Sequence, residues 1–211
     1  MIGRKIKKIC LRRNFFSDKI AVSNAKPLKL RRFIMFEKGE YVVYGQNGIC
    51  KVSEITSLDM SGIDKEKQYY VLLPLSAKGS TIYCPTDNTK LVLRNVLSKE
   101  EAWELIDEIP DIEELWIMNE KMRENDYKQA IRSGNPKELI RIIKTLYLRK
   151  QERIAVGKKM TSTDDKYFHM AEERLYSELA LAIGRDAGEM EAIIKERVDM
   201  KKAVEGESQK L

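Results

Sequence analysis

The chain has 211 residues, of which 43% are hydrophobic and 34% are charged, a composition typical of a soluble folded protein. No apolar stretch approaches the ~20 residues of a membrane-spanning helix, and the N-terminus lacks the continuous apolar core of a secretory signal. We therefore expect a cytoplasmic protein. The cysteines, Cys10, Cys50 and Cys84, have neither CxxC nor metal-ligand spacing, so we predict reduced thiols and no zinc or other metal site.

The formal net charge of +6 is unevenly distributed. Residues 1–34 contain eleven Lys or Arg and one acid, Asp18, which leaves 39 − 11 = 28 bases and 33 − 1 = 32 acids in the rest of the chain. The rest therefore has a net charge of −4. If the folded part contacts nucleic acid, it must do so through a local basic patch on an acidic protein.

Residues 1–34 show no hydrophobic periodicity, whereas a regular pattern begins directly after Met35. One interpretation is a disordered basic arm. We favour the alternative that translation starts at Met35 and that the leader is not native. A chain that begins at Met35 is then expected to keep the stability and binding of the full chain.

The segment from Met35 to Val96 has the pattern of a small β domain. Turn residues, among them Asn47-Gly48, separate short apolar or alternating runs. Five strands are predicted, at about 40–44, 49–55, 68–75, 81–84 and 90–93. Five short strands in this length favour a small Tudor- or SH3-like barrel.

From residue 97 to about 205 the period is helical, which makes the chain an α+β protein: an N-terminal barrel followed by a C-terminal all-α bundle. Ser98 and Glu101 form a capping box, and Asn135-Pro136 begin another helix. The predicted helices are 99–109, 111–132, 136 to before Gly157, 163–183 and 187–202. Trp103 flanks the apolar stripe of the first and is predicted to be a core residue.

Residues suited to catalysis are few. The only histidine, His169, lies on a predicted helix, where a packed or solvated side chain is more common than a general base. No nucleophile elbow, zinc-protease motif or phosphate-binding loop is present. We predict a protein that is not an enzyme and has no cofactor.

Basic residues cluster between Lys137 and Lys159, with eight positive charges in 23 residues against Glu138 and Glu152. An ordinary solvated helix face and a phosphate-contacting patch are equally compatible with periodicity alone. A patch of this kind supplies affinity without base specificity. The candidate DNA-binding residues here are Arg141, Lys144, Arg149, Lys150, Arg153, Lys158 and Lys159.

Trp116 is a further candidate. On the predicted second helix it shares a face with Glu120, Arg123 and Tyr127, and this face is mixed rather than uniformly apolar. We therefore predict that Trp116 is an exposed wedge against an unstacked base, with Arg123 beside it as a DNA-binding residue. The alternative is a core tryptophan.

Several segments resemble one family. The run 36–49, FEKGEYVVYGQNGI, is similar to the opening of the bacterial CarD family, whose barrel is shared with transcription-repair coupling factors. The resemblance continues through 69–72, 83–85, 128–135, 144–153 and 177–182. It covers nearly all of residues 35–184, with both modules in the family's order.

This resemblance implies a monomeric transcription regulator associated with the nucleoid. Its barrel would pair an exposed strand with the RNA polymerase β subunit. Its helical module would contact promoter DNA at the upstream edge of the melted region, without strong sequence specificity, and change the lifetime of the open complex.

Two departures from the family pattern are evident. Alignment on Ser133-Gly134 puts the family's wedge tryptophan at Glu120, one helical turn after Trp116. In the polymerase contact, Leu58 and Tyr83 replace basic residues of the family. The competing hypothesis is a protein-interaction adaptor with purely structural helices, which the acidic body favours slightly.

Overall fold

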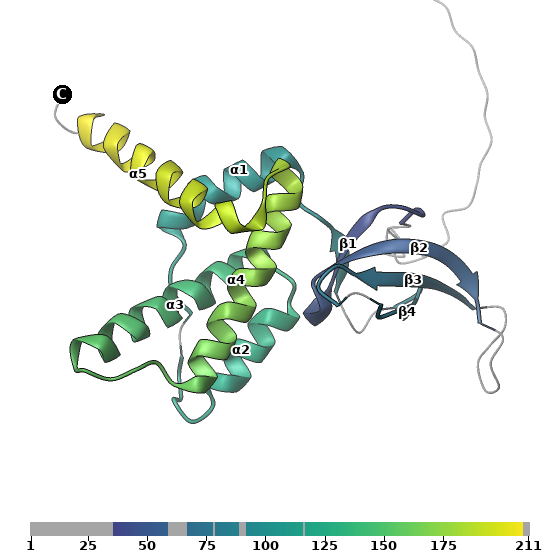
Figure 1. Ribbon diagram of the computed structural model, residues 1–211, viewed down its shortest axis with the longest axis horizontal. Coiled ribbons are helices and arrows are strands. Elements are labelled where there is room, and N and C mark those ends of the chain that lie inside the picture. The colour runs from purple at the N-terminus through teal and green to yellow at the C-terminus, as the bar shows by residue number, and fades with distance from the viewer. Residues whose placement is uncertain (1–35, 59–66, 78, 89–91, 116, 209–211) are drawn as a thin grey trace, which may run out of the picture. The chain divides into compact units, whose positions relative to one another are not determined.

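The computed structural model describes residues 36–58, 67–77, 79–88, 92–115 and 117–208. Between Tyr41 and Asn95 the chain forms a five-stranded antiparallel sheet (Figure 1). The strands are β1 (Tyr41–Tyr44), β2 (Ile49–Ser57), β3 (Gln68–Pro74), β4 (Ile82–Pro85) and β5 (Leu93–Asn95). Their order is β4-β3-β2-β1-β5. The expected barrel is therefore not closed within the described residues, because β4 and β5 lie at opposite edges.

Alternation along the strands builds the core of the sheet. Between β1 and β2, the chain turns through η1 (Gly45–Asn47), and Gly48 has a φ of 69°, as the Asn-Gly pair predicted. One face of the strands is buried with Phe36 in a cluster of eight residues: Phe36, Val42, Tyr44, Cys50, Val52, Tyr70, Leu72 and Cys84. Two of the three cysteines are thus buried, and both are free thiols.

Five helices follow the sheet: α1 (Lys99–Glu108), α2 (Arg123–Arg132), α3 (Pro136–Ala155), α4 (Ser162–Ile183) and α5 (Met190–Ser208). Short 3-10 turns occur at η2 (Ile109–Asp111) and η3 (Ala187–Glu189). The predicted capping box of α1 and the Asn135 cap of α3 are confirmed. None of the helices in the described ranges is long and apolar enough to cross a membrane.

The prediction of a helix over 111–132 is wrong in its first half, because α2 begins only at Arg123. Tertiary hydrogen bonds replace helical ones in the preceding segment. Thr145 Oγ1 accepts a bond of 2.8 Å from the Leu115 N–H. The Lys144 ammonium donates to the carbonyls of Pro110 and Ile112. Side chains of α3 thus satisfy backbone groups that a helix would have paired internally.

A second core lies between the helices and includes Ile106, Tyr127, Ile142, Leu146 and Leu179. Trp103 packs against this core as predicted and is partly buried. The guanidinium of Arg197 on α5 lies 5.8 Å from the centroid of its ring and also pairs with Asp107 of α1. Both contacts fasten α5 to α1.

The sheet and the helices meet at a polar seam centred on Arg94 of β5 and Glu178 of α4. The Arg94 guanidinium donates two bonds to the Glu178 carboxylate and a third, of 2.7 Å, to the carbonyl of Gly134. The Leu97 N–H also donates to Glu178. This carboxylate is 3% exposed, so the seam is a buried ion pair.

Residues 1–35 and Trp116, together with residues 89–91 at the predicted start of the last strand, lie outside the described residues. The boundary predicted between residues 96 and 97 falls in the short connection from β5 to α1.

Candidate functional site

Three of the predicted basic residues form a group at the C-terminal end of α3. Gly157 has a φ of 70°, which turns the chain sharply toward α4. The Arg153 Nε donates a bond of 2.6 Å to the Lys159 carbonyl, which fixes this turn. Lys158 and Lys159 are exposed, and no acidic group within the described ranges pairs with them. Arg153, Lys158 and Lys159 are called the basic turn below.

Arg149 lies one helical turn before Arg153, but its charge is already balanced. The guanidinium of Arg149 donates two hydrogen bonds to the carboxylate of Glu120. This contact raises the pKa of Arg149 and lowers the pKa of Glu120. Glu120 therefore occupies the guanidinium donors of Arg149 that would otherwise bind a phosphate.

A second balanced pair lies beside the first. Arg123, at the start of α2, donates a bond of 3.2 Å to Asp164, whose carboxylate is 2% exposed. The Tyr127 hydroxyl also approaches this carboxylate, at 3.4 Å. Burial raises the pKa of Tyr127 to about 12. These contacts join α2 to the first turn of α4 and give Arg123 a structural role.

The predicted face of Lys137, Arg141 and Lys144 is engaged in contacts within the chain, although Lys137 itself is exposed. Lys137 pairs with Glu108, and Arg141 donates to Glu138 and to the Glu114 carbonyl. Together with the Lys144 contacts described above, these bonds hold residues 108–115 against α3. Lys150, on another side of α3, lies 5.6 Å from the centroid of the Phe168 ring on α4.

The predicted helix face that joins Trp116 to Arg123 and Tyr127 does not form, because α2 begins only at Arg123 and Tyr127 is fully buried. The role of Trp116 remains a prediction from the resemblance. Four exposed apolar side chains were not singled out from the sequence: Met118, Tyr147, Ile154 and Val156. Tyr147 and Ile154, seven residues apart on α3, fall outside its buried stripe, and this spacing was the available signal.

The second candidate surface is the edge of the sheet at β4, which has no neighbouring strand on its outer side within the described residues. Cys84 points into the core, and the alternation turns Tyr83 outward, where it is 51% exposed. On its other side β4 pairs with β3, with Tyr83 opposite Val71. Leu58 is half-buried and directly follows the end of β2, so it does not lie on this edge strand.

His169 is exposed on α4 and lies within 3.5 Å of Asp165 and Glu172, as expected of a solvated helical side chain. The two cysteines of the sheet are poor nucleophiles, because burial raises the pKa of both thiols, that of Cys50 to about 11. In the part of the chain with assigned positions, no group of three or more His, Cys, Asp or Glu side chains is placed to hold a metal ion.

Comparison with protein families gives two matches, in chain order. Residues 36–97 match the CarD-like/TRCF RID domain, and residues 110–195 match the CarD C-terminal domain. The first match spans the sheet, and the second runs from η2 into α5. No individual curated protein matches the chain. The chain belongs to the CarD family of RNA polymerase-interacting transcription factors.

Proposed function

We propose that the protein binds the RNA polymerase β subunit through the free edge at β4 and contacts promoter DNA through the basic turn. Bound in this way, it alters the lifetime of the open complex at the upstream edge of the melted region. The observation that carries the proposal is the presence of both CarD modules, in order, in one chain. Members of this family are transcription factors rather than enzymes.

The position of β4 at the edge of the sheet supports the polymerase contact. An unpaired edge presents backbone donors and acceptors to which a strand of a partner can add. At the opposite edge, β5 is three residues long and Arg94 ties it to the helices. The β4 edge is the better candidate, and Tyr83 would supply a side-chain contact next to the added strand.

Binding of the isolated β subunit to the Tyr83→Ala variant tests this contact, with Tyr147→Ala as the matched control. Both tyrosines are 51% exposed, but Tyr147 lies on α3. We expect Tyr83→Ala to weaken binding while Tyr147→Ala leaves it unchanged. Equal effects of the two substitutions would remove β4 from the interface.

Positive charge that no carboxylate of the described residues balances supports the DNA contact. Arg123 and Arg149 are paired with acidic groups, and Arg141 and Lys144 hold the segment before α2. The basic turn and Lys150 are left to meet phosphates. If three or four of these bases do so, the log–log dependence of DNA affinity on salt has a slope of about −3 to −4.

The test removes two charges from the basic turn. We expect Lys158→Gln with Lys159→Gln to flatten the salt slope by about 2, because each lost phosphate contact contributes about 0.9. The matched control is Lys99→Gln with Lys195→Gln, at exposed positions on α1 and α5. Identical slopes for the two double variants would contradict a DNA site at the turn.

A second candidate function is the protein-interaction adaptor, favoured by the internal pairing of Arg123 and Arg149. An adaptor of this kind would bind polymerase, and promoter DNA would not increase its affinity. Measuring binding to polymerase alone and to polymerase on promoter DNA separates the two functions: equal affinities favour the adaptor.

A further inference from the structure

Two donor atoms of Arg174 on α4 are buried without an acceptor among the described residues. The Nε and Nη1 atoms are inaccessible to solvent, and neither has a hydrogen-bond partner in the part of the chain that the structure describes. Burial lowers the pKa of this guanidinium. Because a buried unpaired donor is unfavourable, native proteins almost always supply an acceptor, from the chain or from a bound molecule.

The neighbouring carboxylates among the described residues do not supply the acceptor. Glu178, one helical turn along α4, is already occupied by Arg94 and by the Leu97 N–H. Glu173 is exposed and forms no ion pair with Arg174. On the other side, Arg174 packs on Gly48, where a Cβ atom would stand 3.4 Å from Nη1. The guanidinium is thus held in place between the sheet and α4.

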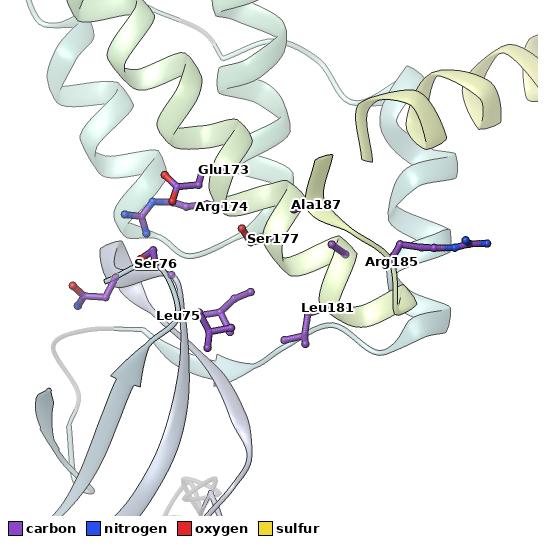
Figure 2. Close-up of a pocket in the computed structure, with 12 residues that line it drawn as sticks. Leu75, Ser76, Glu173, Arg174, Ser177, Leu181, Arg185 and Ala187 are labelled. Atoms are coloured by element: carbon purple, nitrogen blue, oxygen red, sulfur yellow. The ribbon is translucent and has the colours of Figure 1, made fainter. Parts of the chain in front are cut away.

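A cleft of about 340 Å³ adjoins this guanidinium, between the sheet and the C-terminal half of α4 (Figure 2). Leu75 from the end of β3 and Leu181 of α4 contribute apolar walls, with Ala187 of η3. The Ser177 hydroxyl also lines the cleft. Figure 2 shows that Arg185, although it lines the cleft, extends away from Arg174.

We propose that this cleft binds a small organic anion, whose carboxylate or phosphate head pairs with Arg174 and whose apolar body lies against Leu75 and Leu181. The volume falls at the lower end of the ~300–1,000 Å³ range of small-molecule sites. The third nitrogen of this guanidinium, Nη2, is not among the inaccessible atoms, and it would donate charge-assisted hydrogen bonds to an anion in the cleft. It would also contact the sheet and the helices together and so hold the seam between them. This inference is independent of the proposed polymerase and DNA contacts.

The test uses the full chain with four probes: octanoate, octyl phosphate, octanol and inorganic phosphate. Binding is followed by the melting temperature and by amide chemical shifts of Ser76, Ser177 and Leu181. We expect saturable binding of octanoate, of octyl phosphate or of both, which distinguishes a carboxylate from a phosphate head. Octanol, without charge, and inorganic phosphate, without an apolar body, are expected to bind more weakly.

Arg174→Met should weaken binding of the anionic probes by roughly 10- to 100-fold, the loss expected when hydrogen bonds to a charged group are removed. Its melting temperature without ligand should equal or exceed that of the wild type, because an unpaired buried charge is gone. The matched control Arg132→Met, at an exposed arginine of α2 that does not line the cleft, should bind normally. If Arg174→Met does not fold, Leu181→Asp, at a partly exposed wall position, should repel the anion instead.

Three outcomes would overturn the proposal. The first is no saturable response to octanoate or octyl phosphate at low-millimolar concentration. The second is undiminished binding by both Arg174→Met and Leu181→Asp. The third is an equal response to inorganic phosphate and octyl phosphate, which would exclude the apolar walls from the site.

Discussion

Replacing Glu178 by leucine should strongly destabilise the fold, because it leaves the Arg94 guanidinium at the seam without its carboxylate. Removing one partner of a buried ion pair typically costs about 3–5 kcal/mol. The Arg94 side chain is 24% exposed, so partial hydration puts the expected loss near the lower end, at about 3 kcal/mol. For a chain of this length, that loss lowers the melting temperature by about 6–12 °C.

The matched control is Glu108→Leu, which removes the carboxylate of the exposed pair with Lys137. Exposed pairs contribute about 0–1 kcal/mol, so this variant should melt close to the wild type. The double variant Arg94→Met, Glu178→Leu should recover much of the lost stability, because it removes both charges together. Thermal unfolding of the wild type, of Arg94→Met, of Glu178→Leu and of the double variant gives a double-mutant cycle. Additive effects, or a Glu178→Leu variant that melts like the Glu108→Leu control, would refute a buried pair at the seam.

Three further predictions concern other parts of the molecule. Glu120→Gln releases Arg149 and should raise DNA affinity and steepen the salt slope by about 0.9; an unchanged slope would show that Arg149 does not meet phosphate. Burial raises the pKa of Cys50 to about 11 and of Tyr44 to about 12. Folding therefore favours their neutral forms, and the melting temperature should fall as the pH rises from about 9 to 12; a flat profile contradicts this. Trp116→Ala should shorten the open-complex lifetime at unchanged stability, whereas a loss of about 3–5 kcal/mol would identify a core tryptophan.

Local signals predicted the elements that depend on local chemistry. The Asn-Gly turn, the capping box at Ser98 and the Asn135-Pro136 helix start each involve neighbouring residues, and the structure confirms them. The segment before α2 was mispredicted because its hydrogen-bond partners, Lys144 and Thr145, lie about thirty residues away on α3. Periodicity contains no information on such contacts.

The candidate site likewise combines features set by neighbouring residues with features set by distant contacts. Clustering of basic residues in sequence located the basic turn, but it gave no indication that Arg149 is paired with Glu120 across 29 residues. The missing acceptor of Arg174 could not be predicted from the sequence either, because it depends on which carboxylates pair with other arginines in the folded chain. Charge balance at a surface is a property of the folded chain.

The length of β4 has a consequence for how long a partner can stay bound. The strand has four residues, and its last, Pro85, has no N–H to donate. Strand addition at this edge would form only a few backbone hydrogen bonds, and interfaces of one type differ mainly in their dissociation rates. The short edge therefore favours brief residence, so that one molecule could serve many polymerases in succession. It also limits pairing between copies of the chain, for which a long open edge would be a template.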